Sequence, residues 1–224
     1  GGEPLPASLS DAFKARYGLT LYNAYGMTET SLAVAMNTPQ SYREGSVGKP
    51  VPGIEVKIVD EAGRELPAGE AGEIWLKGPM VTHGYHNLPS ETAAAFTPDG
   101  FFQTGDVGRR DADGFLYLVA RKKELIIIAG ENVAPAEVEE ALMAHPAVAE
   151  AAVVGRVDPT RGEIVVAFVI PREGHPPPDP AALREFCRAR GLAQWKVPRE
   201  VHVVADLPRS PTGKILKRAL AQPA

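Results

Sequence analysis

The stretch Tyr25-Gly26-Met27-Thr28-Glu29-Thr30 joins an aromatic ring, a glycine, a hydroxyl and a carboxylate in one short segment. This set suits a nucleotide, because it offers a flat face for a base, close approach of the backbone, a donor for phosphate and a ligand for Mg²⁺. Taken alone, the segment equally fits a strand that ends in a polar turn, with Tyr25 in the core and Glu29 in solvent. Both interpretations stay open at this point.

The composition excludes several classes of protein. With 224 residues, 44% hydrophobic and 23% charged, the chain has room for one large or two small globular domains. The net charge of −4 gives no general attraction to nucleic acid, and no basic stripe or nucleic-acid motif is present. The single cysteine, Cys187, excludes a disulfide framework and favours a cytoplasmic protein. No apolar run approaches the roughly 20 residues of a membrane span, so we expect no transmembrane segment.

The first half of the chain is expected to be mainly β. Residues 6–17 are expected to form a helix that begins at Pro6 and ends at Gly18, followed by a strand over Leu19–Ala24. Residues 45–120 alternate polar and apolar side chains between frequent glycines and prolines, which is typical of a small barrel or sandwich.

After Arg121 the pattern alternates between strands and helices. The expected elements are a strand at Leu125–Ala129, a helix at 135–145, strands at Ala151–Gly155 and Ile164–Ile170, a helix starting at Asp179-Pro180, a strand at Val201–Ala205 and a short helix at Gly213–Ala221. The predicted fold class is α+β. Residues 1–121 would hold a helix, a strand and a distorted β-barrel subdomain, and residues 122–224 a small α+β domain.

Five segments carry a family resemblance through their order and spacing. They are Gly1–Pro6, Tyr25–Thr30, Thr104-Gly105-Asp106, Arg121–Glu124 with Gly130-Glu131-Asn132, and Pro208–Lys214. Together they resemble the superfamily of acyl-adenylate-forming enzymes, which includes acyl- and aryl-CoA synthetases, nonribosomal adenylation domains and firefly luciferase. The resemblance covers nearly the whole chain and implies ATP or AMP, Mg²⁺ and coenzyme A as cofactors and cosubstrates.

The resemblance assigns a nucleotide role to the residues near the start of the chain. It implies that Tyr25 stacks on adenine, that Thr28 bonds the α-phosphate and that Glu29 holds Mg²⁺, with Gly26 and Met27 completing the nucleotide-binding segment. The backbone of Gly1–Pro4, with Gly2, Glu3 and Pro4, would border the adenine.

Two further residues are expected at the ribose. A carboxylate can accept two hydrogen bonds from a cis-diol, which makes Asp106 a candidate ribose ligand, although the residues alone favour an exposed turn aspartate. The resemblance favours the ribose role for Asp106 and implies that Arg121 reaches both ribose and phosphate.

The resemblance also assigns residues to catalysis and domain motion. It implies that Lys214 neutralises the charge that develops during adenylation, and that the domain after Lys123 rotates about this hinge between two half-reactions. Gly130 would border the path of the pantetheine thiol, where a side chain would obstruct the channel. A solvated lysine and a plain turn glycine remain the alternatives from the residues alone.

Two other patterns are not expected to bind metals. His83 and His86 are spaced like a ligand pair, but no third or fourth ligand follows nearby in the sequence. The segment Asp111-Ala112-Asp113-Gly114 starts like a calcium loop but lacks its later ligands, so a hairpin turn explains it better.

The superfamily's glycine-rich phosphate loop, which ends in Pro-Lys-Gly, is not found in this sequence. Because that loop lies upstream of the tyrosine segment in the family, we expect this chain to be the C-terminal portion of a longer enzyme, and to be inactive without the N-terminal region. The expected reaction of the intact enzyme is activation of a carboxylic acid, with a slight preference for a fatty acid, and transfer to coenzyme A. A nonribosomal-type adenylation domain, a non-catalytic module and a homodimer are left open.

Overall fold

The computed structural model describes residue 5 and residues 7–211 and 213–221. The expectations for Gly2, Glu3 and Pro4 at the adenine, and for Pro6 at a helix start, lie outside these residues. The chain divides into two compact units, Gly1–Lys122 and Lys123–Ala224, and each is described by itself. Their assignment to the end of a large domain and to a small mobile domain stays a prediction.

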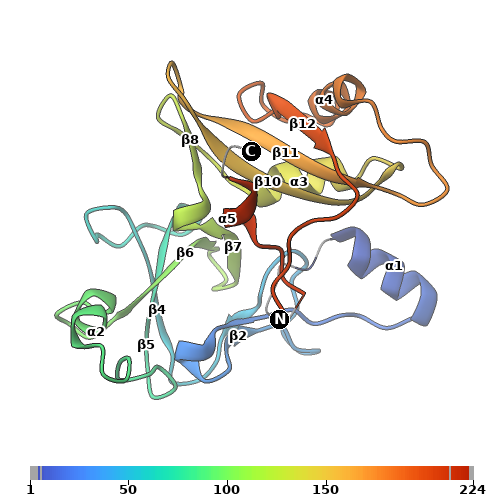
Figure 1. The fold of residues 1–224 in the computed structure, drawn as a ribbon. Helices are drawn as coiled ribbons and strands as arrows, with labels where there is room; N and C mark the ends of the chain where they lie inside the picture. The colour runs from blue at the N-terminus through green and yellow to red at the C-terminus, as the bar shows by residue number, and fades with distance from the viewer. Residues whose placement is uncertain (1–4, 6, 212, 222–224) are drawn as a thin grey trace. The chain divides into compact units, whose positions relative to one another are not determined.

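Within its described residues, the first unit holds a three-stranded and a four-stranded antiparallel sheet (Figure 1). The smaller sheet has the order β1 (Ala24–Gly26), β2 (Ala33–Met36) and β3 (Lys49–Pro50). The larger is a meander of β4 (Glu55–Val59), β5 (Ala71–Lys77), β6 (Phe102–Arg110) and β7 (Leu116–Arg121). A bridge between Gly48 and Leu116 joins them, and one hydrophobic core with Ile74, Leu76 and Leu116 lies across both.

Two helices and a 3₁₀ turn complete the first unit. They are α1 (Ala7–Tyr17), η1 (Thr28–Thr30) and α2 (Pro89–Ala95). The predicted strand over 19–24 is wrong except at Ala24, because the preceding residues meet no partner strand and leave Leu19 and Tyr22 exposed. The all-β expectation for 45–120 missed α2, which begins at Pro89. This helix buries none of its residues, and its sequence therefore lacks the apolar periodicity that would have predicted a helix.

The second unit is built on one mixed sheet in the described part of the chain. Its strands are β8 (Ile126–Ile128), β9 (Glu131–Val133), β10 (Val148–Asp158), β11 (Gly162–Pro171) and β12 (Glu200–Val203). Strands β10 and β11 form the long central hairpin seen in Figure 1, and β12 pairs with β11 in parallel. The helices are α3 (Pro135–Met143), α4 (Pro180–Ala189) and α5 (Lys217–Leu220), preceded by the 3₁₀ turn η2 (Lys122–Glu124) at the boundary between the units.

Helices cover both faces of this sheet. The core on one face joins Val138 and Leu142 of α3 with Leu183 and Cys187 of α4. Leu220 of α5 packs against Val154, Ile164 and Val166 on the opposite face. The last helix is shorter than predicted, because it begins only at Lys217, after an isolated bridge between Arg209 and Ile215. These observations confirm the predicted α+β class.

Candidate nucleotide site

The hydroxyl of Tyr25 and the guanidinium of Arg121 both hold the carboxylate of Asp106. Tyr25 Oη donates a hydrogen bond to Asp106 Oδ2 at 2.6 Å, and Arg121 Nε lies 2.7 Å from Asp106 Oδ1. Tyr25 and Asp106 are each only 5% exposed. Three residues that the sequence analysis selected separately therefore form one polar cluster, in which Tyr25 and Asp106 are buried and Arg121 is partly exposed.

The local structure of β6 explains how Asp106 reaches this position. Asp106 lies directly opposite Arg121 in the β6–β7 register, which places carboxylate and guanidinium side by side. The preceding Gly105 has a φ of +68°, a backbone conformation that glycine adopts most easily. Thr104 Oγ1 donates to the carbonyl of Ile74 at 2.7 Å and accepts from the amide of Asp106 at 3.0 Å, which ties this turn of the strand to β5.

Burial keeps the Tyr25 hydroxyl protonated. Loss of solvation raises the pKa of Tyr25 far above its ordinary value, and the charge of Asp106 and its hydrogen bond to the phenol raise it further. A neutral phenol beside an ionised carboxylate is a hydrogen-bond donor, and the short distance is typical of such a charge-assisted bond. Tyr25 therefore acts as a fixed donor at neutral pH.

Glu29 and Thr28 lie in the turn that follows β1. Thr28 is exposed, whereas Glu29 is half-buried and its Oε1 accepts a hydrogen bond from Tyr85 Oη at 3.1 Å. The Glu29 carbonyl accepts the amide of Thr82 at 2.7 Å, so the backbone and the carboxylate are both fixed by the segment before α2. Sequence reasoning missed Tyr85, because no pattern links a tyrosine to a glutamate 56 residues away.

Gly26 and Met27 stabilise the turn that follows β1. A Cβ on Gly26 would lie 2.0 Å from the carbonyl oxygen of Leu32, so only glycine fits at this irregular point of the β1–β2 pairing. The backbone of Met27 exchanges two hydrogen bonds with the hydroxyl of buried Thr30, at 2.9 and 3.0 Å. Both residues therefore shape the turn that carries Thr28 and Glu29.

Glu73 is a second residue that the sequence analysis missed. Its Oε1 accepts the amide of Gly105 at 3.2 Å, and its Oε2 lies 2.9 Å from Lys122 Nζ. Glu73 thus supports the turn that presents Asp106 and fixes the end of the first unit. Alternation within β5 places Glu73 on one face of the strand, but only the folded sheet shows what it contacts.

Lys123, Gly130 and Lys214 belong to the second unit. Lys123 lies in η2, the first segment of that unit. Gly130, with a φ of +88°, forms the tight turn between β8 and β9 with nothing within 4 Å of the position of a Cβ. Lys214 is exposed on the loop that precedes α5, where its amide donates to Ser210 Oγ at 3.2 Å. Lys123 thus lies at the boundary of the unit, Gly130 in a turn and Lys214 in a loop, and their roles stay predictions.

An arginine-rich pocket lies on the second unit. It is lined by Arg161, Arg184, Arg188 and Arg199, together with Trp195. Trp195 is 47% exposed although it is a large apolar ring. Arg188 is paired with Glu185 at 2.8 Å, and Arg184 donates to the carbonyl of Arg199 at 3.3 Å. A lining rich in arginine beside a half-exposed indole is a candidate site for an anionic group and a stacked ring. The sequence analysis missed this pocket, because its arginines come from segments up to 38 residues apart.

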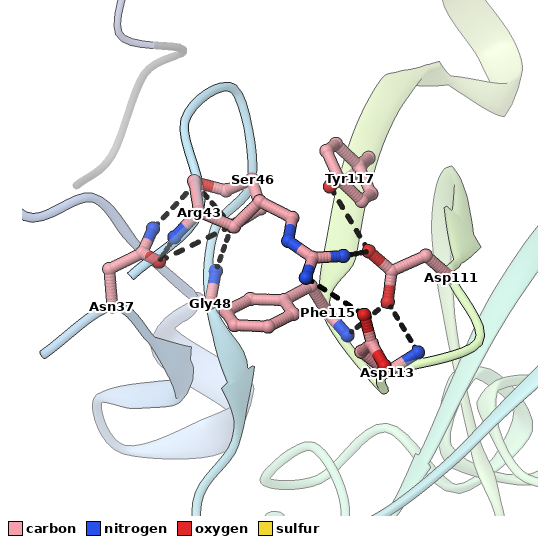
Figure 2. Close-up of polar contacts among 8 residues, drawn as sticks. All are labelled: Asn37, Arg43, Ser46, Gly48, Asp111, Asp113, Phe115 and Tyr117. Atoms are coloured by element: carbon pink, nitrogen blue, oxygen red, sulfur yellow. Dashed lines mark hydrogen bonds and ion pairs between the residues drawn. The ribbon is translucent and has the colours of Figure 1, made fainter. Parts of the chain in front are cut away.

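The hairpin explanation for Asp111–Gly114 is confirmed. Figure 2 shows the Arg43 guanidinium between Asp111 and Asp113, at 2.7 and 2.8 Å, and above the ring of Phe115. The amides of Asp113 and Phe115 donate to Asp111 Oδ1, which closes the turn between β6 and β7. Among the described residues no group of three or more His, Cys, Asp or Glu could hold a metal ion, and His83 and His86 are exposed.

Comparisons with known proteins identify the family of this chain. The family model for the AMP-binding enzyme matches residues 1–86, and that for the AMP-binding enzyme C-terminal domain matches residues 137–214. The sulfoacetate–CoA ligase of Cupriavidus necator is 45% identical over 96% of this chain and 42% of its own length. The 2-succinylbenzoate–CoA ligase of Geobacillus kaustophilus is 46% identical over 98% of this chain and 44% of its own.

A solved structure of the same family has a similar fold. The o-succinylbenzoate coenzyme A synthetase of Bacillus subtilis, in complex with ATP and magnesium ion, superposes with a TM-score of 0.88 at 38% identity. The match covers 99% of this chain and 45% of that one. The chain therefore spans less than half the length of these relatives. In the described residues no helix is long and apolar enough to cross a membrane.

Proposed function

Because this chain belongs to the family of AMP-binding enzymes, which form acyl-adenylates, we propose that it serves in the ATP-dependent ligation of a carboxylic acid to coenzyme A. The observation that carries the proposal is the buried carboxylate of Asp106, held by Tyr25 and Arg121. The chain brings these motif residues together at hydrogen-bond distance, and a carboxylate in such a place suits a ribose diol.

The proposed reaction has two steps. The carboxylate of the acid attacks the α-phosphorus of ATP, so that the bond to pyrophosphate breaks and an acyl-AMP mixed anhydride forms. The thiol of coenzyme A, losing its proton, then attacks the acyl carbon, and AMP leaves with the electron pair of the broken bond. The products are the thioester, AMP and pyrophosphate.

Residues of the first unit are proposed to hold the nucleotide. Asp106 and Arg121 bind the ribose, and Thr28, exposed in the turn after β1, donates to the α-phosphate. Glu29 suits Mg²⁺, because Mg²⁺ takes hard oxygen ligands and is usually held by one or two carboxylates together with substrate phosphates. When bound there, the ion would neutralise phosphate charge. Tyr25 is proposed to stack on the adenine, although the residue is largely buried.

Residues of the second unit are proposed to act at different steps. Lys214 lies exposed on a loop, so its ammonium can approach the carboxylate and the α-phosphate during adenylation and leave afterwards. Lys123, at the first residue of the unit, is proposed as the hinge of that movement. Gly130 would border the thiol path. Nothing lies within 4 Å of the position of a Cβ on this turn glycine.

The arginine-rich pocket supports coenzyme A as the acceptor. Coenzyme A carries several phosphates and an adenine ring, and the pocket presents four arginines beside Trp195. Guanidinium groups bind phosphate oxygens in pairs of hydrogen bonds, and an exposed indole can stack on a base. The alternative acceptor is a carrier protein, which a nonribosomal-type adenylation domain would load.

The acid is proposed to be a small carboxylic acid, with fatty acids as one candidate class. Similar relatives are named for sulfoacetate, for 2-succinylbenzoate and for long-chain fatty acids, so they do not single out one class of acid. A reducing cytoplasm is proposed from the single buried thiol of Cys187. The homodimer stays a prediction, which sedimentation of the purified protein would decide.

The test uses the full-length protein that contains this sequence. Exchange of labelled pyrophosphate into ATP is measured with a panel of sulfoacetate, 2-succinylbenzoate, malonate, benzoate and fatty acids of several lengths. Release of AMP is measured with and without coenzyme A.

We expect exchange with at least one acid and AMP release that requires coenzyme A. Pyrophosphate exchange with no increase in AMP release when coenzyme A is added would favour the carrier-loading alternative. No exchange and no AMP release with any acid would support the non-catalytic alternative and overturn the proposal. The isolated 224-residue chain is expected to give no exchange.

A further inference from the structure

We infer that Tyr25 positions the Asp106 carboxylate through its hydroxyl, and that this hydrogen bond sets the affinity for the ribose of a bound nucleotide. The inference rests on the proposed function, because it assumes that Asp106 binds ribose. It adds a role for a specific atom, Tyr25 Oη, which is separate from any contact of the tyrosine ring with a base.

The burial of Tyr25 directs attention to its hydroxyl. The residue is 5% exposed and belongs to the same core as Val34 and Ala35, which are fully buried. Most of the ring surface is thus in contact with protein. The hydroxyl, by contrast, reaches a carboxylate at 2.6 Å, the shortest class of hydrogen bond for a neutral donor and an anion.

The two donors to Asp106 come from different parts of the first unit. Arg121 is the cross-strand neighbour of Asp106, so their ion pair follows from the β6–β7 register alone. Tyr25 lies on β1 in the other sheet and is 81 residues away in sequence. The tyrosine bond therefore ties the orientation of the carboxylate to the sheet that carries Thr28 and Glu29.

The consequence for a nucleotide follows from carboxylate geometry. A cis-diol bound by a carboxylate needs the carboxyl plane held at a defined rotation about χ2, which is otherwise a broad torsion. A donor on each oxygen fixes that rotation. Removal of the Tyr25 hydroxyl would take away the donor that holds Oδ2 at this rotation, while the ion pair of Oδ1 with Arg121 would remain. Ribose binding would weaken, while contacts to base and phosphates would remain.

The experiment is a double-mutant cycle between Tyr25 and the ribose hydroxyls in the full-length protein. Binding of ATP and of dideoxy-ATP, which lacks both ribose hydroxyls, is measured calorimetrically with Mg²⁺ for the unmodified protein and for Tyr25→Phe. We expect Tyr25→Phe to weaken ATP binding about 5- to 20-fold, which is less than the roughly 10- to 150-fold effect of losing a direct hydrogen bond to a charged group, because the hydroxyl acts on the ribose only through Asp106. Binding of dideoxy-ATP should change less than about 2-fold, because the coupling lies in the ribose contact.

Tyr117→Phe is the matched control. It removes a similar bond, from Tyr117 Oη to Asp111 at 3.1 Å, in the same unit but outside the site. We expect it to leave the ratio of the two affinities unchanged. An equal loss of both nucleotides in Tyr25→Phe would mean that the hydroxyl is merely structural, and would overturn the inference.

A second pair of variants protects the test against misfolding. If Tyr25→Phe melts early, Tyr25 is replaced by para-aminophenylalanine and by para-methylphenylalanine, which have similar volumes but differ in their ability to donate a hydrogen bond. The amino variant should keep the preference for ATP over dideoxy-ATP, and the methyl variant should lose most of it. Identical preferences in the two variants would contradict the inference. If the unmodified protein binds ATP but has no such preference, Asp106 is not a ribose ligand and the inference alone fails; no ATP binding at all would overturn the proposed function too.

Discussion

Replacement of Gly48 by alanine should destabilise the first unit far more than the same change at Gly45. Both glycines have positive φ values, +89° and +73°. At Gly45 nothing lies within 4 Å of the position of a new Cβ, whereas at Gly48 that Cβ would lie 1.9 Å from the carbonyl carbon of Met36. The pair therefore separates the cost of a left-handed backbone from the cost of a clash.

The magnitude follows from what the clash displaces. The left-handed conformation costs an alanine about 1 kcal/mol, and this applies to both variants. At Gly48 the obstacle is backbone, so the segments must separate by about 1.5 Å to restore ordinary contact. Hydrogen bonds from Gly48 N to Ser46 Oγ (Figure 2) and from Leu116 N to the Gly48 carbonyl would then be strained or lost.

The pairing of Met36 with Lys49 would be strained as well. With about 1 kcal/mol for each of two or three lost bonds, and more for the unpaired buried groups, Gly48→Ala should cost about 4–5 kcal/mol in total. This is a large part of the about 5–15 kcal/mol that stabilises a typical domain. Gly45→Ala should cost about 1 kcal/mol.

The measurement is urea unfolding in a Trp195→Phe background. That change leaves Trp75, on β5, as the only tryptophan, so its fluorescence reports the first unit. We expect a much lower midpoint for Gly48→Ala than for Gly45→Ala. A difference of less than about 1 kcal/mol between the two variants would refute the clash argument.

Three further predictions concern Lys214, Arg43 and Arg199. Lys214→Ala in the full-length protein should slow adenylation about 10²–10³-fold and leave thioester formation from supplied acyl-AMP intact, measured as separate half-reactions; equal losses in both would contradict its role. Arg43→Met should lower stability at pH 7, because it removes the ion pair with Asp111. Partial burial acts to raise the pKa of Asp111, but hydrogen bonds from the Phe115 amide and from Arg43 outweigh it, so the pKa lies below its ordinary value. A depressed pKa stabilises the fold above the unfolded value of about 3.9 and loses this effect as the pH falls through the folded value, so the difference between the two proteins should shrink only below about pH 4 in acid titrations of unfolding. Arg199→Gln should raise the KM for coenzyme A about 5- to 10-fold with little effect on the KM for ATP; unchanged kinetics would exclude this arginine from the acceptor site.

Elements with strong local signals could be predicted from the sequence. The helix α4 follows Asp179, whose side chain accepts the amide of Ala182 at 2.9 Å, and α3 begins at Pro135 as its sequence predicts. The short strands β2 and β3 were not predicted, because each has too few residues to show an alternating pattern and is defined by its pairing with another strand. Local propensity carries no information about such partners.

The candidate site likewise has a part that the sequence predicted and a part that only the fold shows. The residue types in Tyr25–Thr30, and the order of the later segments up to Lys214, were enough to recognise the family, because they record which chemical groups a nucleotide requires. The supporting contacts of Glu29 with Tyr85, and of Glu73 with Gly105, were not accessible to such reasoning. They join segments that are far apart in sequence.

The sequence by itself determined the chemistry of this protein: an aromatic residue, carboxylates and cations in the order of an adenylate-forming enzyme. Only the tertiary structure decided that the Tyr25 hydroxyl and the Arg121 guanidinium meet on the two oxygens of Asp106. The physical reason is that hydrogen bonds act over about 3 Å and depend on direction. Their partners are set by how β1, β6 and β7 pack around a common core.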